Sequence, residues 1–386
     1  MSKLIRSSYK AADMVAKQHL WWRRWGWRYN PFEYLDAARD PHLLEYLVIP
    51  KIAKLLRSSD AVMVLAPPGG GKTALRRYLE RHALETGGYI TPVVIVPSRH
   101  PASPHEARMM AVEGLARRLF WQSVHYFRVI PWLQQRDTRH FLGRLWRHYL
   151  RPLPELRLLA QWLRDANWQA LENFLGPAYS PRPSASTLRE IAHVLEEIAS
   201  DPAIEDSLSV EDAWQEALAL LAEWQVHQIW LLVDGLDGFP ESASLTDLWP
   251  MWAKPLEDWI AASRASLLVA LKAFLPNTPG SDEIIKRYED WPWQFLQWED
   301  SEELYKVWRT RLQAASDGLI DSWDALVDPE LRPFEGRLLQ TLPLERRLPR
   351  YLVERAGEVL RCIGRTGVDY LTVSLWRNLN EKWTLS

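Results

Sequence analysis

Three glycines followed by lysine and threonine form the stretch of this sequence best suited to chemistry, Gly69-Gly70-Gly71-Lys72-Thr73. Glycines allow backbone N–H groups to converge on an anion, because no Cβ stands in the way. The lysine would reach the β- and γ-phosphates of a nucleotide, and the threonine hydroxyl would ligate Mg²⁺. Pro68 and Ala74 flank this run and are predicted to share in the phosphate contacts.

An apolar segment and a helical pattern stand on either side of the glycines. Ala61–Leu65 reads as a buried strand, and Leu75, Leu79 and Ala83 recur every fourth residue as on one helix face. Strand, Gly-rich loop and helix in this order are the context of a phosphate-binding P-loop, whose helix N-terminus adds partial positive charge. Ala66 replaces the first glycine of the motif. The flanking elements disfavour the alternative, a Gly/Pro-rich turn that contains Lys-Thr by chance.

A second apolar segment, Gln228–Val233, ends in carboxylates. A Mg²⁺–nucleotide site needs a carboxylate at the C-terminal end of a strand, and Asp234 has that place. A second carboxylate can orient or deprotonate the attacking water, and Asp237 is the nearest candidate. The alternative is a buried strand followed by an acidic turn, which is common without a P-loop elsewhere in the chain.

The turn Asn30-Pro31-Phe32, ahead of the P-loop, resembles the nucleotide-base end of AAA+ and STAND-type ATPases, particularly the origin-recognition-like branch. This resemblance implies that the three residues contact the base of ATP. It covers roughly residues 29–100 and 228–362, and leaves the first 28 residues and the region between without a counterpart.

The Asp-Gly-Leu-Asp sequence after the second apolar segment resembles the Walker B pattern of STAND ATPases. That pattern commonly continues with Glu, where this chain has Gly238, and AAA+ proteins usually place Glu where it has Gly235. The resemblance therefore implies metal binding but not rapid hydrolysis.

Two further residues take family positions by resemblance. Ser266–Pro276 reads as another buried strand with Lys272 at its C-terminal end, where ligands bind in parallel α/β sheets. Lys272 matches the sensor-1 place, and Arg350, after Pro349, matches the sensor-2 arginine that points back to the nucleotide. The alternatives are a structural lysine at a strand end and a solvated arginine on a helix that begins with proline.

Composition sets broad limits on the protein. The chain has 386 residues, 47% of them hydrophobic and 25% charged, with a net charge of −2. Cys362 is the only cysteine, which excludes disulfides within the chain and cysteine-built metal sites. No apolar run is long enough to span a bilayer, and a cytoplasmic protein is expected. The 22 tryptophans follow no repeat and are expected in cores and interfaces.

The sequence predicts an α/β P-loop core with a parallel sheet over residues 29–300 and a C-terminal helical lid over 301–386. Strands are expected at 89–96 and 295–298 besides those above. A helical insertion is expected at about 104–227, with helices over 104–128, 132–150, 155–175, 187–199 and 210–226. The insertion is rich in arginine and tryptophan on a face that either is solvated or binds a partner: Arg136, Arg139, Arg144, Trp146, Arg147 and Arg151.

Residues 1–28 form a basic, tryptophan-rich arm in which seven basic residues accompany one acidic residue. Arg23, Arg24 and Arg28 interleave with tryptophans, as in segments that bind nucleic acid or an anionic membrane surface. The alternative is an arm that packs its tryptophans onto the protein and keeps its arginines in water.

Together these patterns predict a Mg²⁺-dependent ATPase that acts as a switch and couples its nucleotide state to self-association or to a protein partner. Two alternatives stay open at this stage. One is a nucleotide-binding scaffold with little turnover, and the other is a DNA-associated AAA+ ATPase.

Overall fold

The computed structural model describes residues 21–58, 61–97, 99, 101, 103–125, 135–150, 156–176, 182–202, 204, 207–238, 245–263, 267–278 and 280–384. Several sequence predictions lie outside these residues. They concern most of the basic arm, with Lys3, Arg6, Lys10 and Lys17, the insertion residue Arg151, and the predicted element ends at 126–128, 132–134, 155 and 266.

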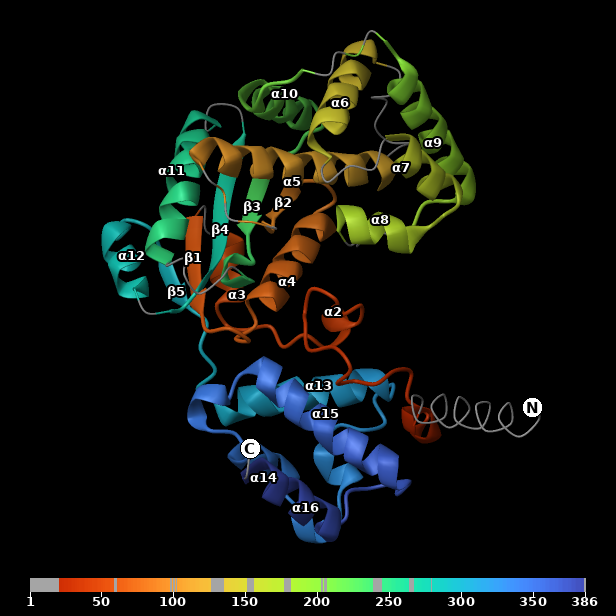
Figure 1. Cartoon of the computed structure of the whole chain (residues 1–386), viewed down its shortest axis with the longest axis vertical. Coiled ribbons are helices and arrows are strands. Elements are labelled where there is room, and N and C mark those ends of the chain that lie inside the picture. The colour runs from red at the N-terminus through yellow and green to blue at the C-terminus, as the bar shows by residue number, and fades with distance from the viewer. Residues whose placement is uncertain are drawn as a thin grey trace, which may run out of the picture. The chain divides into compact units, whose positions relative to one another are not determined.

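The chain contains a five-stranded, all-parallel sheet, which confirms the predicted α/β class (Figure 1). The strand order is β2-β3-β4-β1-β5. The strands are β1 (Ala61–Ala66), β2 (Ile90–Ile95), β3 (Gln228–Val233), β4 (Leu268–Pro276) and β5 (Trp293–Phe295). Nearly every residue of β1 to β4 is buried, as expected for parallel strands covered on both faces. The predicted last strand, 295–298, is displaced, because β5 already ends at Phe295.

By their contacts, the residues of the chain divide into two compact units. The sheet unit comprises Ile52–Leu65 and Tyr78–Phe295, and the helical unit comprises Met1–Lys51, Ala66–Arg77 and Leu296–Ser386. Each unit has its own cluster of buried apolar side chains. None of the helices in the described ranges combines the length and the apolarity needed to cross a membrane.

In the sheet unit, α5 (Pro104–His125) and α11 (Leu245–Ser263) pack against the sheet and against each other. α5 lies very close to β2, because a Cβ on Gly114 would stand 2.6 Å from the carbonyl oxygen of Val94. Any other residue at this position would push the helix away from the strand. Two short helices, α3 (Ala53–Ser58) and α12 (Ser281–Arg287), complete the sheet unit outside the insertion.

The predicted insertion is helical and packs on α5 (Figure 1). Its other helices are α6 (Arg136–Tyr149), α7 (Leu156–Arg164), α8 (Trp168–Leu175), α9 (Ala185–Ser200) and α10 (Val210–Glu223). The prediction of a single helix over 155–175 is wrong, because the helical conformation is interrupted between α7 and α8. Ala166 adopts a left-handed φ of 50°, and the Asn167 side chain accepts a hydrogen bond from the Ala170 N–H at 3.2 Å, starting a new helix.

The arginines of the insertion are largely held by the insertion itself. Arg139 pairs with Glu197 at 2.7 Å, and Arg147 donates to the carbonyl oxygens of Ile204 and Asp201 at 2.8 and 3.0 Å. Arg147 also donates to the carbonyl of Ile198. These contacts favour a structural role for this face over a partner-binding one.

The helical unit is built from α2 (Leu43–Tyr46), α13 (Ser301–Ala315), α14 (Phe334–Gln340), α15 (Pro349–Thr366) and α16 (Val373–Thr384). The C-terminal helices were predicted, and α13 and α15 begin where their N-terminal signals, Asp300 and Pro349, stand. Large aromatic side chains fill the core of this unit, among them Trp308, Trp323 and Phe334. α4 (Lys72–Glu85) begins in the helical unit and ends in the sheet unit.

The described part of the basic arm is tied to the helical unit. Trp21, Trp25 and Trp27 pack on its core or form part of it. Arg28 forms ion pairs with Glu45 and Asp317 and donates to a backbone carbonyl at 3.1 Å. Arg24 likewise donates to the carbonyls of Ile363 and Val368. These contacts favour the packing interpretation, and nucleic-acid binding through the arm stays a prediction.

Arg147 provides a test of the structural role of the insertion arginines. We expect Arg147→Ala to lower the free energy of unfolding by about 2 kcal/mol, because three carbonyls lose a charged donor. Arg157→Ala, an exposed position on α7, serves as the control and is expected to change it by less than about 0.5 kcal/mol. Urea unfolding measures both variants, and equal stability would refute the structural role.

Candidate functional site

The predicted P-loop joins β1 to α4 through residues 67–71. Gly69 and Gly71 adopt left-handed φ values of 83° and 98°, which β-substituted residues rarely reach. The Gly70 N–H donates to the carbonyl oxygen of Pro67 at 3.0 Å and closes a tight turn. The helix starts at Lys72, so its first N–H groups, which have no partner within the helix, follow the glycines directly. The sequence therefore forms the compact loop and helix start that a phosphate site requires.

Lys72 is only 4% exposed and lies against the loop. Its Nζ donates to the carbonyl oxygens of Ala66 and Pro67 at 2.9 and 3.3 Å. These two carbonyls belong to the end of β1 and the beginning of the loop. The Lys72 side chain therefore runs from the start of α4 back to the residues at which the loop begins.

Two segments that follow the sheet in sequence also contact the loop. The indole N–H of Trp298 donates to the carbonyl oxygen of Gly70 at 2.9 Å. The backbone N–H of Arg350 donates to the carbonyl oxygen of Gly69 at 3.3 Å. Arg350 contacts the loop through its backbone, and the predicted approach of its side chain to a nucleotide stays a prediction. The sequence analysis missed Trp298, because it assigned this residue to a strand. The residues next to Trp298 in sequence also give no sign of a contact with Gly70, which lies 228 positions away.

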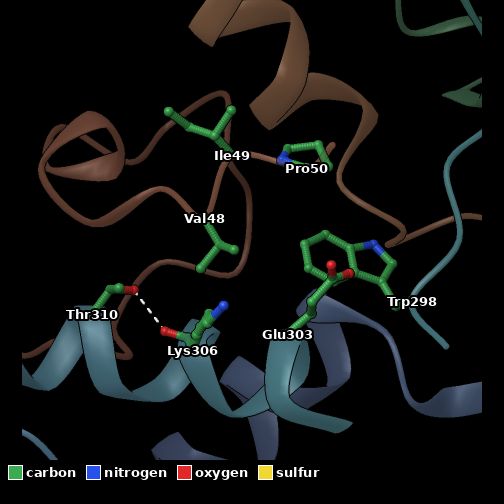
Figure 2. Close-up of a pocket in the computed structure, with 7 residues that line it drawn as sticks. All are labelled: Val48, Ile49, Pro50, Trp298, Glu303, Lys306 and Thr310. Carbon is green, nitrogen blue, oxygen red and sulfur yellow. Dashed lines mark hydrogen bonds between the residues drawn. The ribbon is translucent and has the colours of Figure 1, made fainter. Parts of the chain in front are cut away.

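Beside Trp298 lies a pocket of about 270 Å³ (Figure 2). Val48, Ile49 and Pro50 form one side, from the extended segment that follows α2. The other lining residues are Trp298 and three residues of α13, Glu303, Lys306 and Thr310. Lys51 pairs with Glu303 at 3.0 Å, and this carboxylate raises the pKa of Lys51. The pocket thus combines apolar and aromatic walls with a charged rim.

The structure packs the predicted base-binding turn into the core of the helical unit. Phe32 is 3% exposed and stacks on Trp323 with 5.7 Å between ring centroids. Asn30 accepts a hydrogen bond from the Phe32 N–H, and the carbonyl of Pro31 accepts one from Arg311. These contacts give the turn a structural role, and its contact with a base stays a prediction.

The predicted metal and water-orienting carboxylates follow β3 in the sheet unit. Asp234 is 2% exposed, and its N–H donates to the carbonyl of Ile95 at 3.0 Å, extending the β2–β3 ladder. Because the strands are parallel, Asp234 stands at the edge of the sheet where β1 also ends. Asp237 is exposed on a 3₁₀ turn, Leu236–Gly238. No three His, Cys, Asp or Glu side chains of the described ranges gather into a metal cluster.

Lys272 does not lie at a strand end, and this prediction is corrected. β4 continues to Pro276, so Lys272 stands at its centre, paired in register with Leu232 and fully buried. Its ammonium lies 4.6 Å from the centre of the Trp230 ring, a cation–π contact. The His82 ring of α4 also lies near this indole, with 6.3 Å between ring centroids, and burial lowers the pKa of His82. These surroundings suit a structural lysine, while a sensor role stays untested.

Comparison of the chain with protein-family models, curated proteins and solved structures finds no match. Fold and site together define an α/β protein with a five-stranded parallel sheet and a glycine loop between β1 and α4 that belongs to the helical unit.

Gly69 allows a test of the contact between the loop and Arg350. A Cβ at Gly69 would lie 2.9 Å from the Cβ of Arg350, and Gly87, with a similar φ of 70°, has open space around it. We expect Gly87→Ala to cost about 1 kcal/mol from its left-handed backbone alone, and Gly69→Ala to cost clearly more. Thermal unfolding compares the two, and an equal loss would show that the loop does not press on Arg350.

Proposed function

We propose that the protein binds ATP with Mg²⁺ at residues 67–74, hydrolyses it slowly, and acts as a molecular switch of the AAA+/STAND kind. One observation carries this proposal: a loop with two left-handed glycines joins a buried parallel strand to a helix that starts with Lys-Thr. A site of this build places backbone N–H groups, a helix N-terminus and an ammonium group on one anion. Triphosphates are the anions that such loops bind.

In this proposal Thr73 and Asp234 are the protein ligands of the Mg²⁺ ion, as the sequence pattern predicts. Mg²⁺ keeps several waters and is commonly held by one or two side chains together with substrate phosphates. Thr73 follows the loop that begins where β1 ends, and Asp234 follows β3 at the same edge of the parallel sheet. The proposal therefore needs only these two protein ligands.

The pocket beside Trp298 offers a second candidate place for the base, in addition to Asn30-Pro31-Phe32. Its volume of about 270 Å³ suits one part of a ligand such as a purine ring, since whole drug-sized ligands occupy roughly 300–1,000 Å³. Its aromatic wall and charged rim fit a flat heterocycle with polar edges. The backbone groups of Val48 and Ile49 form no hydrogen bond with any described residue, so they are available to such an edge.

Turnover is expected to be slow. Asp237 is exposed on a 3₁₀ turn, whereas a carboxylate that activates water efficiently is commonly held in a site that excludes solvent. Gly235 and Gly238 supply no carboxylate of their own. Slow turnover suits a switch that changes its assembly or its partner when ATP is replaced by ADP. The alternatives are a scaffold without turnover and a DNA-associated ATPase.

Lys72 tests the nucleotide site. Hydrogen bonds to charged groups contribute about 1.5–3 kcal/mol, so Lys72→Ala should weaken ATP binding roughly 10- to 100-fold. Lys54→Ala, on the exposed side of α3, is the control and should bind as the wild type does. Calorimetric titration with MgATP gives the affinities, and circular dichroism shows that both variants fold. Undiminished ATP binding by Lys72→Ala would remove the proposal.

Asp234 and Asp237 test the assigned chemistry. We expect Asp234→Ala to abolish Mg²⁺-dependent phosphate release, because the metal loses its protein carboxylate. Asp237→Ala should slow release while ATP affinity stays near the wild-type value, and the exposed Asp290→Ala should change neither. Steady-state phosphate release with and without Mg²⁺ separates these cases. An Asp237→Ala variant that hydrolyses ATP at the wild-type rate would contradict the water-orienting role.

A further inference from the structure

We propose that Trp298 is a positioning residue that orients the glycine loop for phosphate and links it to the pocket. This inference rests on the proposed function and adds a residue that neither the motif nor the resemblance contains. Trp298 lies in the segment between β5 and α13, far from the loop in sequence. It combines two contacts: its N–H donates to Gly70, and its ring lines the pocket (Figure 2).

The effect on the loop follows from the geometry of a peptide group. The Gly70 carbonyl and the Gly71 N–H belong to one planar trans unit, so they point in opposite directions. By binding this carbonyl from one side, the indole fixes the Gly71 N–H toward the other side. Gly71 N–H donates to no described residue, whereas Gly70 N–H is already used in the turn with Pro67. Trp298 thus holds the peptide whose N–H is available to an anion.

A glycine loop needs such a restraint. Glycine peptides rotate easily because both signs of φ are open to them, and the peptide that Trp298 holds joins two glycines, Gly70 and Gly71. The indole also covers Gly71, since one of its ring carbons lies 3.8 Å from the place of a Cβ on that residue. Rotation of this peptide would therefore break a hydrogen bond and displace a packed ring.

Through the same ring, binding of the base would be coupled to binding of the phosphates. A base that occupies the pocket would pack against the indole and restrict its motion. A fixed indole holds the Gly70 carbonyl, and the Gly71 N–H then meets a phosphate without further ordering. Binding of the base and of the phosphates should therefore reinforce each other through Trp298. The entropy of ordering the indole and the Gly70–Gly71 peptide is lost only once for both.

Trp298→Phe tests the inference, because it keeps a ring against the pocket and removes only the N–H donor. We expect its affinity for MgATP to fall about tenfold, as for one lost hydrogen bond in a preordered site, while adenosine binds within about twofold of the wild type. Trp298→Ala should weaken both ligands. Trp293→Phe is the matched control, since Trp293 donates a 2.9 Å bond to the carbonyl of Tyr288 and is likewise half-buried. It should bind both ligands normally.

Calorimetric titrations with ATP and adenosine, alone and in competition, give these affinities. Equal ATP affinity for Trp298→Phe and the wild type would overturn the inference, as would an equal loss for ATP and adenosine. Hydrogen exchange of the peptide that spans Gly71 provides an independent measurement on the folded fraction. Its amides should exchange faster in Trp298→Phe than in Trp293→Phe, and identical rates would also overturn the inference. A wild-type protein that binds no ATP would instead refute the proposed function itself.

Discussion

The structure depends on holding a short glycine loop in a conformation that it would not keep alone. Left-handed glycines make the turn from β1 into α4, and glycines also rotate more freely than other residues. Three donors restrain its carbonyls: the Lys72 ammonium, the Trp298 indole and the Arg350 backbone. Buried β1 fixes one end of the loop and α4 the other, so the rest of the fold serves to bring these donors to it.

Much of the fold could be predicted because its signals are local. Apolar runs mark the parallel strands, and the glycine run between such a strand and a helical pattern marks the loop. The errors concern two features that the local sequence does not mark, the position of Lys272 within β4 and the interruption at Ala166. The apolar residues Ala273–Leu275 continue β4 beyond Lys272, and the cation–π contact with Trp230 makes a buried lysine tolerable in mid-strand. The helix is interrupted at Ala166 although no glycine or proline there indicates it in the sequence.

The parts of the candidate site that sequence could not supply are those made by distant segments. Trp298 and Arg350 have the same relation to the loop, yet only Arg350 was predicted, because a family pattern places an arginine there. Trp298 belongs to no such pattern. The pocket depends on α13 and on the segment at Val48, which meet only in the folded chain. Charge counts alone could not show that Arg28 and Arg147 form contacts within the protein.

The contacts of α4 show how an event at the loop would reach the helices. Arg77, on the first half of α4, donates to the backbone carbonyl of Asp40 at 2.7 Å. The buried Asp40 carboxylate accepts a hydrogen bond from Tyr46 and pairs with Arg311 of α13 at 3.5 Å. A buried charge pair of this kind tolerates little displacement, because separation would leave its members without compensation. Any movement of α4 that accompanies phosphate binding would therefore be carried to α13, the helix that also forms one side of the pocket.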